Sequence, residues 1–153
     1  MLHLPMVKIK YPEYTFKMKE AQGKELIWDD IRKKWVRLTP EEWVRQNFIQ
    51  YLAQVHGYPA ALMAVEKEIW LHDVKKRCDI VVYCQGAPWM IVECKEMEVP
   101  LDDLVLRQIL TYNMSVPVPY LTITNGLYAA VFSRQGGALV PLEALPLWPE
   151  SVT

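Results

Sequence analysis

Two mostly apolar stretches on either side of Gln85-Gly86-Ala87 constrain the fold of this chain more than any other feature. They comprise residues 77–84 and 88–95, and the Val, Ile, Tyr and Trp residues in them favour extended backbone. Two such runs joined by a short segment that contains glycine are typical of a β-hairpin. We therefore predict two consecutive strands, Arg77–Cys84 and Pro88–Lys95.

The charged residues of this hairpin are few and regularly placed. Asp79 and Glu93 are equidistant from Gly86, so a three-residue loop would place them directly opposite each other. Their Cβ atoms would then be roughly 4.5–5.5 Å apart. Lys95 and Arg77 would form the next pair on the same face, because side chains repeat every second residue. The register is a prediction, since a slip of one residue would turn one strand's side chains to the other face.

Two carboxylates at this distance repel each other unless a positive group lies between them. A hard divalent cation with oxygen ligands, Mg²⁺ or Mn²⁺, would meet that need. Such an ion lowers the pKa of a bound water and holds a phosphate oxygen. Lys95 would then orient that water or offset charge that develops on phosphorus. The residues alone leave a second interpretation open, in which Asp79, Glu93, Arg77 and Lys95 form only a surface salt-bridge cluster.

A first helix is predicted before this hairpin. Thr39 is a good N-cap, Pro40 suits the first helical position, and Glu42 completes a capping box. Gly57 ends the helix. Its apolar stripe consists of Val44, Phe48, Tyr51, Leu52 and Val55.

A second helix is predicted after the hairpin, capped by Asp102 or Asp103 and running to about Asn113. Its predicted stripe consists of Leu101, Leu104, Val105, Gln108 and Tyr112. Within that stripe Gln108 would be a buried amide, and a buried amide needs hydrogen-bond partners. Tyr112 fits core packing as well as a place in a site.

Further strands are expected at Leu62–Ile69, Tyr120–Thr124 and Leu127–Phe132, the last two joined by Asn125-Gly126. The order helix, three strands, helix, two strands favours an α/β fold with one mixed sheet flanked by helices. A separate hairpin is expected from Tyr14–Glu20 and Glu25–Trp28. We therefore divide the chain into an N-terminal extension (1–37), a core (38–135) and a Pro-rich C-terminal tail packed on the core (136–153).

Charge and cysteine content limit the classes of function. The net charge is −1, with nine Lys or Arg against five Asp or Glu in residues 1–37. The basic clusters Arg32–Arg37 and Lys75–Arg77 would contact phosphates or simply form solvated faces. The cysteines Cys78, Cys84 and Cys94 form no CxxC pair, which favours reduced thiols in a cytoplasmic protein over disulfides or a zinc site. No apolar run reaches the roughly 20 residues of a membrane span, and the N-terminus does not resemble a signal peptide.

Several of these segments together resemble a known family of nucleases. Cys78-Asp79 followed by Glu93-Cys94-Lys95 resembles the PD-(D/E)XK signature, although Cys78 stands where that signature has proline. Gln108 and Tyr112 are similar to the QxxxY motif of RecB-type nucleases. The run from Leu38 to Gln46 and the segments Gly57–Pro59, Lys76–Tyr83, Ile91–Lys95 and Thr124–Gly126 are similar, in this order, to the N-terminal nuclease domain of type I restriction enzyme R subunits. The resemblance covers about residues 28–132.

The resemblance implies a restriction-endonuclease-like core with the order αβββαβ. It implies Asp79, Glu93 and the backbone carbonyl of Cys94 as ligands of Mg²⁺ or Mn²⁺, Lys95 as the catalytic lysine, and Gln108 as a residue that reaches the site from the neighbouring helix. Related nucleases often place an acid of the first helix near the metal. We nevertheless expect neither Glu41 nor Glu42 to be a direct ligand, because the capping box already accounts for Glu42.

The function expected from this resemblance is metal-dependent hydrolysis of DNA phosphodiester bonds by a metal-activated water. The alternative is a non-catalytic nucleic-acid-binding or assembly module that retains the nuclease fold. The chain contains no GxxxxGK[ST] motif, so we expect no ATP-driven motor in it. It would act as a stand-alone relative or with separate motor and specificity subunits. A homodimer would supply two sites for double-strand cleavage.

Overall fold

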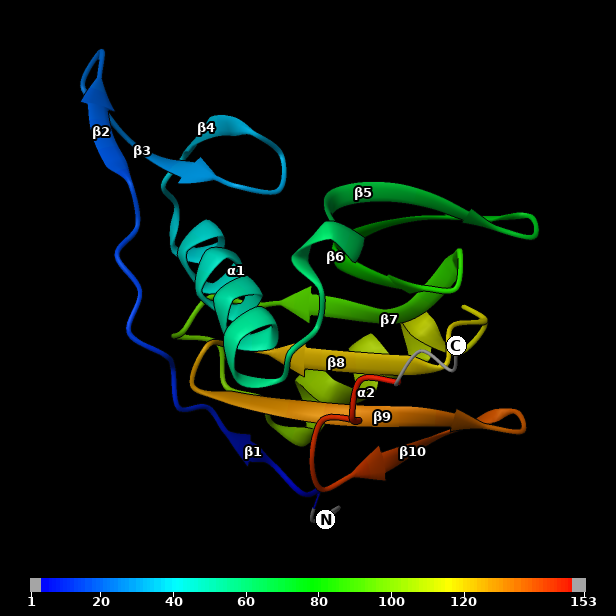
Figure 1. Ribbon diagram of the computed structural model, residues 1–153. Coiled ribbons are helices and arrows are strands. Elements are labelled where there is room, and N and C mark those ends of the chain that lie inside the picture. The colour runs from blue at the N-terminus through cyan, green and yellow to red at the C-terminus, as the bar shows by residue number, and fades with distance from the viewer. Residues whose placement is uncertain (1–3, 150–153) are drawn as a thin grey trace.

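The computed structural model describes residues 4–149, which form a main seven-stranded sheet and a smaller second sheet (Figure 1). Along the main sheet the order is β1-β9-β8-β7-β6-β5, and β10 also pairs with β9. Its strands are β1 (Val7–Lys8), β5 (Met63–Leu71), β6 (Val74–Cys84), β7 (Ala87–Cys94), β8 (Tyr120–Thr124), β9 (Tyr128–Gln135) and β10 (Ala138–Leu142). Only β7 and β8 pair in parallel within residues 4–149. The chain is therefore an α/β protein with a mixed sheet, as predicted.

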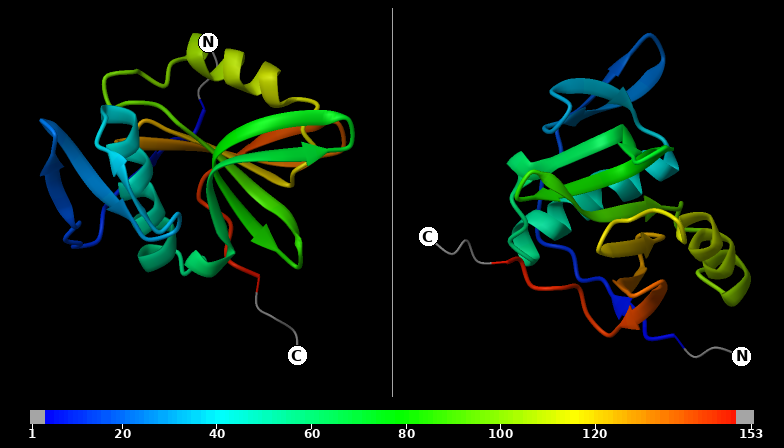
Figure 2. Two further views of the ribbon diagram at one scale, coloured as in Figure 1. Left: turned by 90° about the horizontal axis from the view of Figure 1, so that it is seen from above. Right: turned by 90° about the vertical axis from the view of Figure 1, so that its right-hand side faces the viewer.

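The helices α1 (Pro40–Gln50) and α2 (Asp103–Asn113) lie on opposite faces of the main sheet (Figure 2). Parallel neighbours need a crossover connection, and α2 supplies it between β7 and β8. Each helix covers its own apolar cluster, the first containing Val44 and Phe48 and the second containing Leu106. In the described part of the chain, no helix is long and apolar enough to cross a membrane.

The first helix begins where the sequence predicts. The Thr39 hydroxyl accepts a hydrogen bond from the backbone N–H of Glu42, at 3.1 Å. The helix continues in π-helical form as η1 (Tyr51–Val55), and a short 3-10 turn, η2 (Ala60–Leu62), precedes β5. The predicted stripe is buried apart from Val55, which is 49% exposed. The capping box is half present, because the Glu42 side chain bonds to Arg32, Arg45 and Gln46 and not back to the cap.

The predicted inward face of the second helix is wrong. Leu104 and Tyr112 are 67% and 76% exposed, and Gln108 is exposed as well. The buried residues of α2 are Leu106 and Asn113, with Ile109 and Leu110 packed partly against the same cluster. The Asp102 side chain caps the helix by accepting from the N–H of Val105. The helix thus begins as predicted but is rotated about its axis relative to the prediction.

A second sheet lies beside α1, at the upper left of Figure 1. It consists of β2 (Met18–Ala21), β3 (Lys24–Asp29) and β4 (Lys34–Arg37), all antiparallel. The hairpin expected at Gln22-Gly23 is present as β2 and β3, and β4 is a further strand that the sequence analysis did not include. The boundaries proposed at residues 37 and 135 stay predictions, and β10 extends the main sheet beyond the second of them.

The turn between β8 and β9 brings the sheet close to α1. Gly126 has φ +89°, and a Cβ atom there would lie 3.1 Å from Cγ2 of Val44 and 3.3 Å from Cγ of Met97. The Asn125 carboxamide oxygen accepts from the N–H groups of Leu127 and Tyr128, which shapes the turn. Only glycine combines this backbone conformation with so close an approach. The Asn125-Gly126 pair therefore fixes the end of β8 against the helix that bears Glu41.

Candidate active site

The β6–β7 hairpin has the predicted register but a different turn. Cys84 pairs with Ala87, which leaves a two-residue turn of Gln85 and Gly86, both with positive φ. A register shift between Val82 and Tyr83 then compensates for the missing loop residue, so Ile80 pairs with Val92. Asp79 and Glu93 are the next residues beyond that pair. They lie where the described β6–β7 ladder ends, and the expected three-residue loop is wrong.

The carboxylates of Glu41, Glu66 and Asp79 form a cluster on the α1 side of this point. One carboxylate oxygen from each lies within 4.8 Å of the others. Glu41 comes from the first turn of α1 and Glu66 from β5, at the position opposite Asp79 in the β5–β6 register. Such a set of oxygen ligands suits a hard divalent cation. The structure thus places Glu41 beside Asp79, and the expectation that it is not a direct ligand stays a prediction.

Arg45 already supplies positive charge to this cluster. Its Nη2 lies 2.8 Å from Oδ1 of Asp79, 2.5 Å from Oε1 of Glu66 and 3.4 Å from Oε1 of Glu41. Its Nη1 bonds to Glu42 at 2.7 Å. Burial alone would lower the pKa of the Arg45 guanidinium, but the hydrogen bond to Asp79 and the surrounding carboxylates raise it above its ordinary value. Arg45 is therefore a permanent cation among these acids.

Asp79 is held from two sides. Its Oδ1 accepts from Arg45 and its Oδ2 accepts from the backbone N–H of Cys94, at 2.8 Å. The second bond fixes the carboxylate to β7, next to Glu93 and Lys95. The Cys94 carbonyl, predicted as a metal ligand, stays a prediction. Burial raises the pKa of the Cys94 thiol well above its ordinary value, so this side chain is a neutral core residue.

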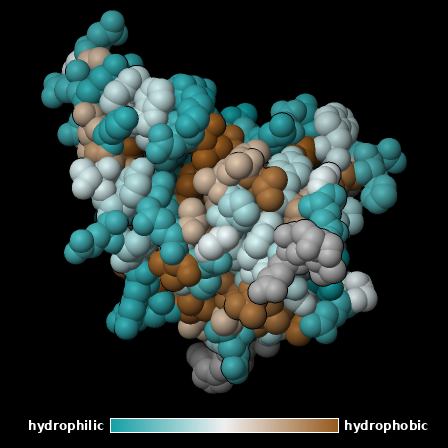
Figure 3. Space-filling view, viewed as in Figure 1, coloured by the Kyte–Doolittle hydropathy of each residue, from teal (hydrophilic) through white to brown (hydrophobic). Residues whose placement is uncertain are grey.

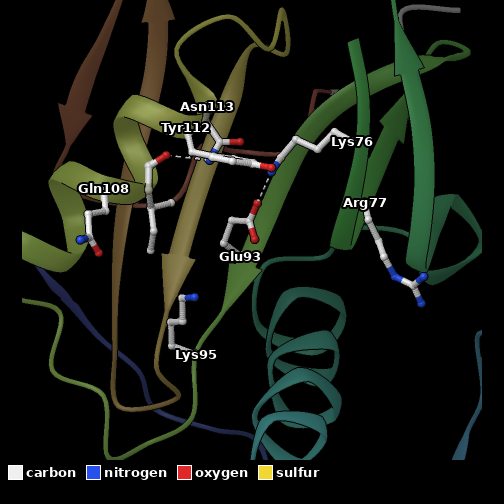
Figure 4. Close-up of a pocket in the computed structure, with 8 residues that line it drawn as sticks. Lys76, Arg77, Glu93, Lys95, Gln108, Tyr112 and Asn113 are labelled. Atoms are coloured by element: carbon white, nitrogen blue, oxygen red, sulfur yellow. Dashed lines mark hydrogen bonds and ion pairs between the residues drawn. The ribbon is translucent and has the colours of Figure 1, made fainter.

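Glu93 faces the other side, toward α2. Its Oε1 lies 2.8 Å from the ammonium of Lys76, whose side chain is only 7% exposed (Figure 4). Burial raises the pKa of Glu93, while the bond to Lys76 opposes that rise and the charge of Asp79 adds to it. The negative charge of Asp79 thus acts on Glu93, although Arg45 contacts Asp79 and Lys76 contacts Glu93.

A cavity of about 350 Å³ opens beside Glu93. Its lining comes from β6, β7 and α2 and consists of Lys76, Arg77, Glu93, Lys95, Gln108, Ile109, Tyr112 and Asn113. Lys95 directly follows β7 and lies below Glu93 in Figure 4, and among residues 4–149 no carboxylate lies within ion-pair distance of its ammonium. An unpaired lysine at the mouth of a cavity is available to an anionic ligand.

Gln108 and Tyr112 line this cavity from the exposed side of α2. The predicted burial of the Gln108 amide is wrong, and Figure 4 shows that amide directed away from Glu93. The Tyr112 ring lies 4.8 Å from the ammonium of Lys76, which contacts Glu93. Arg77, predicted to lie opposite Lys95, bonds to Glu66 at 2.7 Å, and the described β6–β7 ladder ends before that pair.

Sequence reasoning missed Glu66, Arg45 and Lys76. A signal for Glu66 was available, because Glu66 and Asp79 are equidistant from the turn at His72-Asp73, just as Asp79 and Glu93 are equidistant from Gly86. The φ of +53° at Glu66 interrupts the side-chain alternation of β5 at this position. No role was predicted for Arg45, and Lys76 was included only in the basic cluster Lys75–Arg77, whereas both side chains are buried among their partners.

No curated protein and no solved structure matches the chain. The family described as the type I restriction enzyme R protein N terminus (HSDR_N) matches residues 40–146. This match spans α1, the strands β5 to β10 and α2, and so includes Glu41, Glu66, Asp79, Glu93 and Lys95. The chain therefore belongs to the family of type I restriction enzyme R protein N-terminal domains.

Proposed function

We propose that this chain is a metal-dependent nuclease that hydrolyses phosphodiester bonds in DNA. The observation that carries the proposal is the position of Asp79, which lies between the Glu41–Glu66 carboxylates on one side and Glu93 of the adjacent strand, with Lys95 directly after that strand, on the other. Membership of the restriction enzyme family supports the same class of activity. The succession α1, β5, β6, β7, α2, β8 supports a restriction-endonuclease-like core of the order αβββαβ.

Asp79 and Glu93, with the Cys94 carbonyl, would hold Mg²⁺ or Mn²⁺, and Glu41 or Glu66 would complete the oxygen ligands. The donor set fits such an ion, because it consists of carboxylates without histidine or a thiolate. When bound, the ion supplies a water of lowered pKa and offsets negative charge on the phosphate. The substrate phosphate would enter the cavity that Glu93 and Lys95 line.

The protein's own residues would position the reacting groups. Lys95 has a free ammonium that would donate to a phosphate oxygen or orient the attacking water. The Cys94 N–H holds one oxygen of Asp79 and so fixes the direction of its carboxylate. Gln108 would contact the substrate from α2, as its place in the cavity lining allows.

A second candidate is a non-catalytic nucleic-acid-binding or assembly module. The observation in its favour is that the acids are already paired, Asp79 with Arg45 and Glu93 with Lys76. An ion must compete with both cations for these carboxylates. We favour catalysis because Lys95 remains unpaired beside them, and a purely structural ion-pair cluster has no use for a further free cation.

We propose DNA as the substrate and the cytoplasm as the place of action. Two further proposals concern partners: separate motor and specificity subunits, or a second copy of the chain that would bring a second site to duplex DNA. Sedimentation of a strict monomer would contradict the dimer.

The test is cleavage of supercoiled, linear and single-stranded DNA with Mg²⁺, with Mn²⁺ and with EDTA. We expect metal-dependent cleavage that falls by about 100-fold or more in Lys95→Met and in Asp79→Asn. Lys8→Met and Asp73→Asn are matched controls, because both residues are exposed and lie outside the cluster, Lys8 in β1 and Asp73 in the turn between β5 and β6. Absence of cleavage with either metal would contradict the proposal that the chain cleaves DNA on its own. If the variants cleaved DNA at the wild-type rate, the observed cleavage would come from a contaminant.

A further inference from the structure

The small sheet β2-β3-β4 has two faces of different character. Side chains alternate between the faces along each strand. One face carries Ile27 and Asp29, both 0% exposed, and packs toward α1, where Phe16 and Trp43 have ring centroids 5.3 Å apart. The other face points to solvent, and we call it the cationic face. Its basic and aromatic residues are Lys17, Lys19, Lys24, Trp28, Trp35 and Arg37, and Ala21 and Leu26 lie on the same face.

The pairings of the strands place these residues together. Lys19 is opposite Leu26, which is in turn opposite Arg37, so both cations share one row across the sheet. Trp28 is opposite Trp35 in the next row, and the N–H of Trp28 bonds to the carbonyl of Lys17. All four basic side chains of the cationic face are exposed. In Figure 3 the projection at the upper left, which this sheet forms, is accordingly mostly hydrophilic.

The acidic residues of the three strands avoid this face. Glu20 and Glu25 pair with each other, and by alternation both lie with Asp29 on the opposite face. Asp30 follows β3 at the rim, where it accepts hydrogen bonds from the Trp28 indole N–H and from the Tyr14 hydroxyl. Four cations therefore share one surface without an acid from its own strands, and the net charge of −1 for the whole chain conceals this separation. Like charges gathered in this way attract an anionic partner.

The two tryptophans give the cationic face a rigid centre. Their ring centroids are 5.4 Å apart in an edge-to-face arrangement, and the Lys19 ammonium lies 4.5 Å from the centroid of the Trp35 ring. A cation over an aromatic ring stabilises the hairpin modestly. That contact would explain why a lysine stands at position 19, but it involves Lys19 alone. It does not account for Lys17, Lys24 and Arg37, for which no acid lies within ion-pair distance among residues 4–149.

The sheet is also fixed to the helix of the candidate site. Arg32, in the β3–β4 turn, bonds to Asp29 of β3 and, at 2.7 Å, to Glu42 of α1. Arg37 at the end of β4 is only four residues before Glu41 in the sequence. A ligand on the cationic face would thus be held in a constant position relative to the acidic cluster.

We propose that the cationic face binds the sugar–phosphate backbone of duplex DNA and so positions the strand for the site. This inference rests on the proposed function, since it assigns a binding surface to the same substrate. The lysines and Arg37 contact successive phosphates, and the exposed edges of the tryptophans pack on the sugars between them. Contacts of this kind are independent of sequence and strongly dependent on salt.

The test measures binding of a fluorescent 20-base-pair duplex, about two helical turns, by anisotropy in EDTA, where no cleavage occurs, from low to moderate KCl. The variant is Lys19→Gln/Lys24→Gln/Arg37→Gln, and the matched control is Lys8→Gln/Lys10→Gln/Lys67→Gln, three exposed lysines outside this sheet. We expect the first variant to lose at least about 10-fold in affinity at low salt and to reduce the slope of log K against log salt by about 2.7, or 0.9 for each lost contact. The control variant should keep nearly the wild-type affinity and nearly the wild-type slope. Circular dichroism verifies that both variants fold.

Equal affinity and equal slope for the wild type and the first variant would overturn the inference, whatever the cleavage assay shows. Equal losses in both triple variants would also overturn it, because they would indicate only a general effect of charge. Failure of the wild type to bind duplex DNA at low salt would overturn it too, and would favour an acidic protein as the partner. Selective loss of binding in a protein that cuts nothing would support this surface and contradict the proposed catalysis.

Discussion

At the scale of single residues, Arg45 is the centre of the candidate site. Its guanidinium contacts Glu41, Glu42, Glu66 and Asp79, while Arg32 also contacts Glu42 and Arg77 also contacts Glu66. Burial, and next the charge of Asp79, still raise the pKa of Glu41, so repulsion among the carboxylates remains, as is common where carboxylates serve a function. A divalent ion would reduce that repulsion further, either by joining Arg45 or by displacing it from Asp79.

Replacement of Arg45 tests this balance. We expect Arg45→Met to destabilise the fold by about 3–5 kcal/mol, because it leaves buried carboxylates without their partner. We also expect Mn²⁺ to raise the melting temperature of Arg45→Met more than that of the wild type, since the ion then replaces the missing charge. Differential scanning calorimetry with and without Mn²⁺ measures both effects.

Arg77→Met is the control for Arg45→Met, because Arg77 also contacts Glu66 but its side chain is 68% exposed. An exposed pair of this kind contributes less than about 1 kcal/mol. If Mn²⁺ stabilised the wild type, Arg45→Met and Arg77→Met equally, or stabilised none of them, the acidic cluster would not be the binding site of the ion.

Glu41 gives a prediction for pH. Burial, and next the charge of Asp79, raise the pKa of Glu41 above its ordinary value. A carboxyl whose pKa is raised by folding contributes stability below its unfolded-state pKa of about 4.3 and loses that contribution as pH rises through the folded-state value. Glu41→Gln, which does not titrate, should therefore be more stable than the wild type at pH 7 and similar to it at pH 4.

The expected gain for Glu41→Gln is a few tenths of a kcal/mol, because the side chain is half exposed and screened by water. Urea denaturation at the two pH values measures it, and Glu143→Gln, an exposed acid outside the cluster, is the matched control. A larger gain at pH 4 than at pH 7 would show that the sign is wrong.

At the scale of elements, the sequence predicted what local rules determine. The Thr39 cap follows from a side-chain hydrogen bond. The offset of β6 against β7 at Ile80 and Val92 agrees with the count about Gly86 only because a register shift compensates for the shorter turn. The inward face of α2 was predicted wrongly, because Leu104 and Tyr112 fit a helical stripe as well as Leu106 does. Only packing against the sheet decides between such stripes. The positive φ of Glu66, which interrupts the side-chain alternation beside Asp79, likewise follows no local pattern in the sequence.

The cap of α1 carries a prediction for this element. Thr39→Ala should destabilise the protein by about 1 kcal/mol, since the backbone N–H of Glu42 loses its acceptor. Because Glu41 lies in the turn that would fray, the same change should also weaken Mn²⁺ binding, measured by isothermal titration. Thr39→Ser keeps the hydroxyl and should restore both properties. Equal loss in Thr39→Ser and Thr39→Ala would exclude the hydrogen bond as the cause.

At the scale of the whole molecule, one ion-pair network joins the two sheets. It runs from Asp29 in β3 to Arg32, Glu42 and Arg45, and ends at Asp79 in β6. Asp29 is fully buried, and although burial opposes the change, its hydrogen bonds from Arg32 and the backbone lower its pKa. The small sheet is thus attached to the main one through charges as well as through apolar contacts, and Arg32 is the link that crosses between them.

Replacement of Arg32 should therefore loosen the small sheet without unfolding the main one. Arg32→Met leaves Asp29 buried and without its partner, a change that costs about 3 kcal/mol for an ion pair of this burial. Hydrogen exchange followed by mass spectrometry should show faster exchange of β2, β3 and β4 amides, by about 10-fold or more, and unchanged exchange in β7 and β8. Arg37→Met, at an exposed position of the same sheet, should leave the exchange within about twofold, because surface substitutions change stability by less than about 0.5 kcal/mol. Faster exchange throughout both sheets would contradict this division, since it would mean that they open as one cooperative unit.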